Sequence, residues 1–140
     1  MRRERGFARV AWVLSLLLLL LGLPARGAAF QFGHLVQIEQ LSFHPDTLTV
    51  PGGTFAVLVV QNREDGPILH EVLSKDLFQA GTLVLVHGTG QIEYSEKRVS
   101  RVLLDPGEEV VIWFYAEKGR TYSFQCNLNG HAMQGTVLAT

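Results

Sequence analysis

The feature that most limits the fold of this chain is a series of short β-branched and aromatic runs that follows residue 29. Runs such as TFAVLVVQN (54–62) and VVIWFYA (110–116) have the composition of β-strands, and turn-forming segments such as PGG, REDGP and DPGEE separate them. No stretch of this part shows the apolar periodicity of an amphipathic helix. Seven or eight short strands in about 110 residues predict an all-β fold, a Greek-key sandwich or barrel.

Three segments of this strand pattern need separate interpretation. Residues 34–43 (HLVQIEQLSF) indicate one continuous first strand. Residues 97–104 (KRVSRVLL) indicate a strand whose apolar positions are partly out of phase. Residues 77–100 contain HGTGQIEYSEK, which is compatible with a hairpin, a loop or a short helix.

The N-terminus has the three regions of a secretory signal peptide in order. MRRERGFAR is basic, VAWVLSLLLLLLGL is apolar, and PARGAA supplies small residues for a signal-peptidase cut on the general secretory route. The apolar run is shorter than the roughly 20 residues that span a bilayer, so a retained membrane helix is disfavoured. We expect cleavage after Ala29, with Ala28 or Gly27 as alternatives. Residues 1–29 would then be the signal peptide and residues 30–140 one domain, periplasmic or secreted.

Removal of the signal peptide changes the charge balance. The whole chain has 12 basic and 13 acidic residues, and five arginines and one glutamate leave with the signal peptide. The remaining 7 basic and 12 acidic residues give the domain a formal net charge of −5. This domain has no basic stripe to neutralise phosphates, so the sequence disfavours nucleic acid as a partner.

Cys126 is the only cysteine, which is unusual for an exported chain. Thiols normally pair in oxidising compartments, and a lone cysteine has no partner within its own chain. Such a residue is either a buried, inert side chain or a functional thiolate. Its neighbours favour the second interpretation, because His131 and Met133 follow within eight residues.

A second histidine, His70, lies 56 residues before Cys126 in the expected strand ILHEVLS. In a sandwich, the ends of such distant strands can meet at one pole, and we expect His70, Cys126, His131 and Met133 to converge there. A thiolate and two imidazoles, with a long axial thioether contact, are the ligands of a blue-copper centre. The sequence therefore predicts one copper ion per chain.

At these residues the chain resembles the cupredoxin family, the relatives of plastocyanin and azurin. The resemblance extends from about residue 43 to the end and rests on FHPDTLTVPGGTFAVLVVQN, LHEVLSKDLF, LDPGEEVVIWF and GRTYSFQCNLNGHAMQGTV. It implies a copper site with ligands at His70, Cys126 and His131, and an axial ligand at Met133. The phrases LHE and KDLF are most similar to cupredoxin domains of exported copper proteins and of bacterial iron-transport systems.

The last loop departs from the family pattern, because only Ala132 separates His131 from Met133. Met133 is therefore either the axial ligand or a core side chain. We interpret Glu71 as a solvated strand residue, and as the alternative axial donor if Met133 is not a ligand. The three remaining histidines are interpreted as ordinary surface or core residues: His34, His44 and His87.

The preferred functional interpretation is a soluble, monomeric electron carrier with a transient redox partner such as a cytochrome, an oxidase or a reductase. The alternatives are a periplasmic copper-binding or delivery protein, whose partner is a copper acceptor, and an accessory domain of a metal-uptake system. Copper-handling sites often collect several Met or His residues, and this chain has no such tract, which favours the carrier. We expect no enzymatic activity, because the sequence offers one mononuclear site and no signature of a catalytic group.

Overall fold

The computed structural model describes residues 33–78 and 84–140. The predicted signal peptide lies outside these residues, as do residues 79–83 of the segment 77–100. The described part contains eleven strands and one short 3₁₀ helix, and none of its helices is long and apolar enough to cross a membrane. In chain order the elements are β1 (His34–Glu39), β2 (Ser42–His44), β3 (Thr47–Val50), β4 (Thr54–Asn62), β5 (His70–Val72), β6 (Val84–Gly88), β7 (Gln91–Ser95), β8 (Arg98–Leu104), β9 (Glu109–Ala116), β10 (Thr121–Cys126), η1 (Leu128–Gly130) and β11 (Met133–Ala139).

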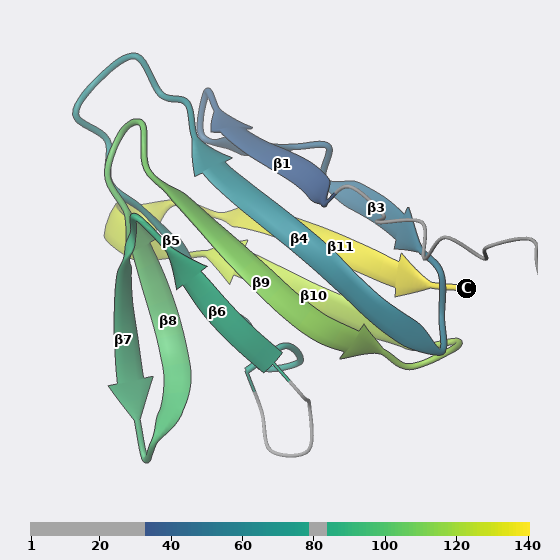
Figure 1. The fold of residues 1–140 in the computed structure, drawn as a ribbon. Coiled ribbons are helices and arrows are strands. Elements are labelled where there is room, and N and C mark those ends of the chain that lie inside the picture. The colour runs from purple at the N-terminus through teal and green to yellow at the C-terminus, as the bar shows by residue number, and fades with distance from the viewer. Residues whose placement is uncertain (1–32, 79–83) are drawn as a thin grey trace, which may run out of the picture. The chain divides into compact units, whose positions relative to one another are not determined.

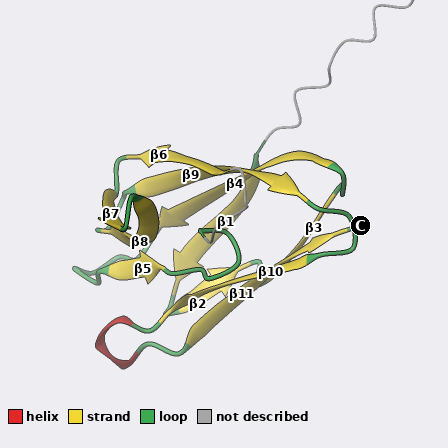
Figure 2. Ribbon diagram, turned by 90° about the horizontal axis from the view of Figure 1, so that it is seen from below, coloured by secondary structure: helices red, strands yellow, loops and turns green. Residues whose placement is uncertain are grey.

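The strands form one five-stranded sheet and two three-stranded sheets. The larger sheet has the order β2-β1-β4-β9-β6, and the smaller sheets have the orders β10-β11-β3 and β5-β8-β7. In Figure 1 the strands β4, β9 and β6 run side by side, and Figure 2 shows them in one layer with β10 and β11 in the facing layer. Most sheet neighbours are distant in sequence, and the predicted all-β sandwich is confirmed.

The core lies between these two layers. Alternate residues of β4 and β9 are buried, which gives the five-stranded sheet one inward apolar face, as a period of two requires. Two aromatic pairs join the layers edge to face: Phe114 with Tyr122, at 5.1 Å between ring centroids, and Phe43 with Phe124, at 4.8 Å. The core thereby fixes the facing strand β10, which ends at Cys126.

The prediction of one strand over residues 34–43 is wrong. Gln40 and Leu41 adopt φ angles of 51° and 56°, and the chain reverses there between β1 and β2. A two-residue hairpin loop with positive φ at both positions usually takes Asn or Gly, so Gln-Leu gives no sequence signal for a turn. This hairpin is one reason why the described part has more strands than the predicted seven or eight.

The segment over residues 77–100, whose sequence is compatible with a hairpin, a loop or a short helix, contains a hairpin strand. Within residues 84–100 the chain forms β6, β7 and the first part of β8, and β7 pairs with β8 in antiparallel register. The turn between them again uses non-glycine residues with positive φ, Glu96 and Lys97. This additional strand, β7, is the second reason for the higher strand number.

The three-residue strand β5 connects two of the sheets close to the expected site. It pairs with β8, and Leu73 just beyond its end forms a two-way backbone bridge with Gln125 of β10, at 2.9 and 2.8 Å. This bridge holds the beginning of β5, where His70 lies, beside the end of β10, where Cys126 lies.

Candidate metal centre

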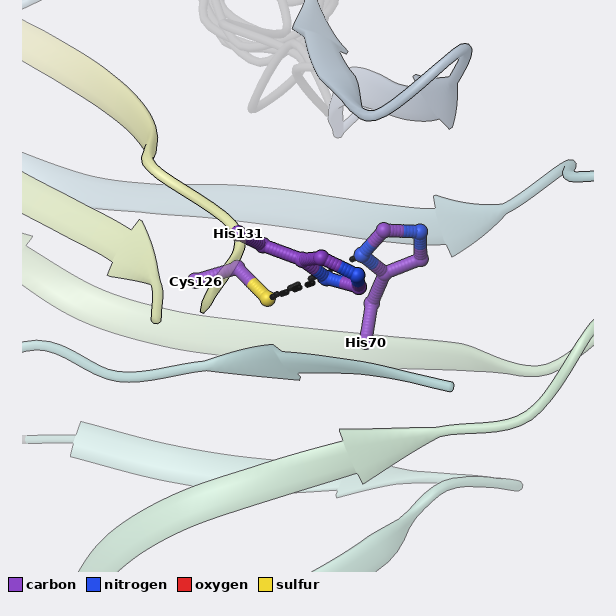
Figure 3. Close-up of side chains that lie close together, drawn as sticks. All are labelled: His70, Cys126 and His131. Atoms are coloured by element: carbon purple, nitrogen blue, oxygen red, sulfur yellow. Dashed lines mark hydrogen bonds between the residues drawn. The ribbon is translucent and has the colours of Figure 1, made fainter. Parts of the chain in front are cut away.

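Three of the four predicted site residues converge at one end of the sandwich. His70 is the first residue of β5, Cys126 is the last residue of β10, and His131 follows the 3₁₀ turn. The Cys126 Sγ atom lies 3.6 Å from Nδ1 of each imidazole, and one donor atom from each residue lies within 4.8 Å of the others. Figure 3 shows the sulfur atom and the two rings directed toward one another.

The loop after β10 explains how His131 returns to Cys126. Asn129 and Gly130 have φ angles of 52° and 82°, so the chain turns sharply after one helical turn. The His131 N–H donates to the Leu128 carbonyl at 2.9 Å, and the backbone is extended again at His131. The five-residue step from cysteine to histidine therefore forms a closed turn that presents both side chains to the same point.

Burial of the three residues is unequal. His70 and Cys126 are both 0% exposed, whereas His131 is half-buried. Burial lowers the pKa of His70, against a hydrogen bond to Glu64 that raises it, so this imidazole is neutral at neutral pH. A neutral imidazole has a free lone pair on one nitrogen and is the form that binds metals.

The chemistry of the three donors fits a transition-metal ion. A thiol carries one proton and can donate it to only one of the two imidazoles that lie equally close. Zinc, for example, binds nitrogen and sulfur at metal–donor distances of about 2.0 to 2.3 Å. When one ion binds both a sulfur and a nitrogen in this way, the two donor atoms lie roughly 3.6 Å apart. One thiolate with two imidazoles is the equatorial ligand set of a mononuclear copper site.

Met133, the fourth predicted residue, lies beside this group. It is the first residue of β11, is 4% exposed, and is the direct antiparallel partner of Cys126. Directly opposite residues of an antiparallel pair place their side chains on the same face of the sheet. The backbone therefore puts the thioether on the side of the sheet where the thiol lies.

The interpretation of Glu71 as a solvated residue is wrong. Its side chain is buried, and its carboxylate accepts hydrogen bonds from the Asn127 N–H at 3.1 Å and from Arg101 Nη1 at 3.4 Å. Its own N–H donates to Cys126 Sγ at 3.4 Å. Glu71 thus ties β5 to the loop that follows the cysteine, and it is not one of the grouped donors found in the described part.

Two further residues organise the centre, and neither was predicted from the sequence. Asn62, at the end of β4, is fully buried; its Nδ2 donates to the carbonyls of Ile68 and Leu104, each at 2.9 Å. Its Oδ1 accepts the Glu64 N–H at 3.1 Å, and Glu64 Oε1 lies 3.3 Å from Nε2 of His70. The only sequence signal for them is the polar run QNREDGP just before ILHEV, and its composition predicts no more than a turn.

The other three histidines lie elsewhere in the fold. Among residues 33–78 and 84–140, the only grouped donors are those of the centre described above, and none of these histidines belongs to them. His44 and His87 are exposed, on β2 and β6, and His34 is half-buried at the start of β1.

Comparison with known proteins agrees with this fold. A family model described as a cupredoxin-like domain matches residues 11–139, and the chain belongs to that family. The structure of auracyanin B is similar, with a TM-score of 0.54 and 18% sequence identity over 77% of this chain and 88% of that one. Reduced auracyanin from Roseiflexus castenholzii is also similar, with a TM-score of 0.53 and 18% identity over 76% of this chain and 94% of its own. No curated protein sequence matches the chain.

Proposed function

We propose that this domain binds one copper ion and carries single electrons between redox partners. His70, Cys126 and His131 would bind the ion, with Met133 as axial ligand. Copper, when bound, supplies one-electron exchange between Cu(I) and Cu(II). The observation that carries the proposal is the placement of one thiol sulfur equally close to two imidazole nitrogens.

The contacts around the centre suit a carrier, because they hold the donors in place from several directions. The bridge between Leu73 and Gln125 and the bond from Asn127 to Glu71 tie the segment with His70 to the segment with Cys126. Donors held in this way move little when the charge of a bound ion changes. Small movement keeps the reorganisation that accompanies each electron transfer small.

Electron exchange would take place at His131. It is the one candidate ligand of the three that is half-buried rather than fully buried, so its ring edge is the shortest route to the surface. Small neighbours, Gly130 and Ala132, flank it in the sequence, and Pro67 and Ile68 supply apolar surface in the loop before His70. Apolar surface of this kind would suit brief docking of a redox protein such as a cytochrome, an oxidase or a reductase.

We infer export from the N-terminal sequence, with a signal peptide over residues 1–29 and a mature, monomeric domain over residues 30–140 in the periplasm or medium. Mass spectrometry of the protein recovered from those fractions tests this. A mature N-terminus at Phe30 is expected, and a chain that keeps its first 29 residues would contradict export by cleavage.

The metal is tested by adding Cu(II) to the purified copper-free domain and recording the visible spectrum. Binding of one equivalent with an intense thiolate-to-copper band is expected. A colourless complex would contradict the proposed site.

The role is tested by two rates measured on the copper-loaded domain. A carrier exchanges electrons rapidly with a soluble cytochrome and keeps its metal. Rapid loss of copper to a metal-free acceptor, with slow electron exchange, would instead assign the protein to copper delivery or to a metal-uptake system.

A further inference from the structure

The two ring nitrogens of His70 have different partners. Nδ1 lies 3.6 Å from Cys126 Sγ, and Nε2 lies 3.3 Å from Oε1 of Glu64 on the other side of the ring. A neutral imidazole carries its proton on only one nitrogen, and a carboxylate is an acceptor. The proton therefore belongs on Nε2, which leaves the lone pair of Nδ1 directed at the candidate metal centre.

Glu64 is itself held in place. Its side chain is only 9% exposed, and Oε1 also accepts the Leu41 N–H at 2.8 Å. Leu41 belongs to the turn between β1 and β2, and the Glu64 backbone is fixed by Asn62. The carboxylate is thus clamped between a hairpin 23 residues earlier in the chain and the histidine six residues later.

The surroundings of Glu64 suit a carboxylate anion. Its Oε1 accepts the Leu41 N–H and faces Nε2 of His70, so N–H donors from two separate segments converge on it. Hydrogen bonds donated to a carboxylate favour its charged form.

We propose that Glu64 is a positioning residue for the candidate copper centre. Glu64 selects the Nε2–H tautomer of His70, and the charge of its carboxylate favours the oxidised ion. This inference rests on the proposed function. A carboxylate that accepts the second N–H of a metal-binding histidine fixes the ring and makes its other nitrogen a stronger donor. Stronger donation and a nearby negative charge both stabilise Cu(II) more than Cu(I).

The role is specific to one of the two histidines. Among the described residues, no carboxylate is hydrogen-bonded to His131, whose Nδ1 pairs with Cys126 only. The half-buried imidazole, where we place electron exchange, is thus free of this constraint. The effect of Glu64 should therefore appear in the signals of His70 and not in those of His131.

The positioning part is tested without copper, by ¹⁵N NMR of the imidazoles in the metal-free domain. In the wild type, His70 is expected in the Nε2–H tautomer. The same tautomer is expected in Glu64→Gln, because the amide oxygen still accepts a hydrogen bond. In Glu64→Ala a mixture of the two tautomers is expected. An Nδ1–H tautomer in the wild type, or no change in Glu64→Ala, would overturn the proposal. If these variants do not fold, Glu64→Asp keeps the charge but shortens the side chain, and the same loss of the single tautomer is expected.

The charge part is tested by the reduction potential of the copper-loaded Glu64→Gln variant. Loss of the charge should favour Cu(I) over Cu(II) about tenfold, which is roughly 59 mV upward for one electron. The matched control is Glu39→Gln, which removes the same charge from an exposed residue two positions before Leu41. Equal shifts in both variants would overturn a specific role for Glu64. A wild type that binds no copper would overturn the proposed function instead, while the NMR result would still decide the positioning.

Discussion

Cys126 and Met133 are direct partners across the antiparallel ladder between β10 and β11. Only six residues lie between them, and the chain between them forms the 3₁₀ turn and presents His131. The short spacing between His131 and Met133 is therefore no obstacle to a shared site, because Met133 lies on the strand next to Cys126. Whether the Met133 sulfur binds the metal as an axial ligand can be tested with variants of this residue.

Replacement of Met133 by leucine should leave the blue colour in place and raise the reduction potential. The thiolate and two imidazoles remain, and loss of an axial donor destabilises Cu(II) more than Cu(I). The similar volume of leucine should limit the loss of stability to less than about 1.5 kcal/mol. Potentiometry and thermal unfolding of the same variant measure both effects. An unchanged potential would assign Met133 to the core and leave a backbone carbonyl or three-coordinate copper as alternatives.

Met133→Glu gives the complementary result. As an axial ligand, a hard carboxylate should lower the reduction potential, because it favours the oxidised ion. As a core residue without a metal, the same carboxylate would be buried without a partner and the domain would unfold readily. The potential and the melting temperature of this variant therefore separate ligation from packing.

The thiol and the two imidazoles should be indispensable, and the other histidines should not. Cys126→Ser, His70→Ala and His131→Ala are each expected to abolish the intense visible band, because each removes one of the converging donors. The matched controls remove a histidine elsewhere: His34→Ala, His44→Ala and His87→Ala. A lost spectrum in one of these three would show that the ligand set is wrong.

Glu71 should contribute to stability even without a metal. Glu71→Ala leaves the Asn127 N–H without its acceptor, which should cost about 1 to 3 kcal/mol in urea unfolding of the copper-free domain. Glu71→Gln keeps an acceptor oxygen and should cost less. Glu39→Ala, at an exposed position, serves as the control and should change little. Equal stability of Glu71→Ala and wild type would contradict the linking role.

Asp76 should contribute stability that depends on pH. The Ser123 hydroxyl and then the Ser123 N–H donate to its carboxylate, and these bonds hold its pKa below the usual 3.8. Since the folded pKa is the lower one, this stability is present above pH 3.8 and is lost as the pH falls through the folded value. Asp76→Asn should be less stable than wild type at pH 7, and the difference should shrink in acid. A constant difference in urea midpoints from pH 7 to acid would contradict this assignment.

The strands could be predicted from the sequence where burial imposes alternation. β4 and β9 have apolar residues on their inward face and Gly or Pro segments at their ends, so both appear in the printed sequence with nearly correct bounds. The turn at Gln40 and Leu41 could not be predicted, because neither residue favours a positive φ. Tertiary contacts impose that turn: the Glu64 carboxylate, 23 residues away, accepts the Leu41 N–H.

The candidate ligands could be predicted because thiol and imidazole are rare side chains whose spacing is informative. The residues that hold them could not, because acids and amides are common beside turns. Glu64 and Glu71 differ from surface glutamates only through partners distant in the chain, and Asn62 differs from surface amides only through the two carbonyls that it joins. Without knowledge of those partners, a buried carboxylate and a solvated one look alike in a sequence.

The complete burial of Cys126 also bears on how the chain survives before it receives a metal. A thiol that solvent can reach is oxidised stepwise to sulfenic and higher acids, or is captured as a mixed disulfide by another protein. Cys126 is 0% exposed, between the backbone of Glu71 in β5 and the ring of His131, so the folded domain shields its sulfur from oxidants and foreign thiols. In the folded domain, burial therefore protects the sulfur that the proposed copper ion would bind.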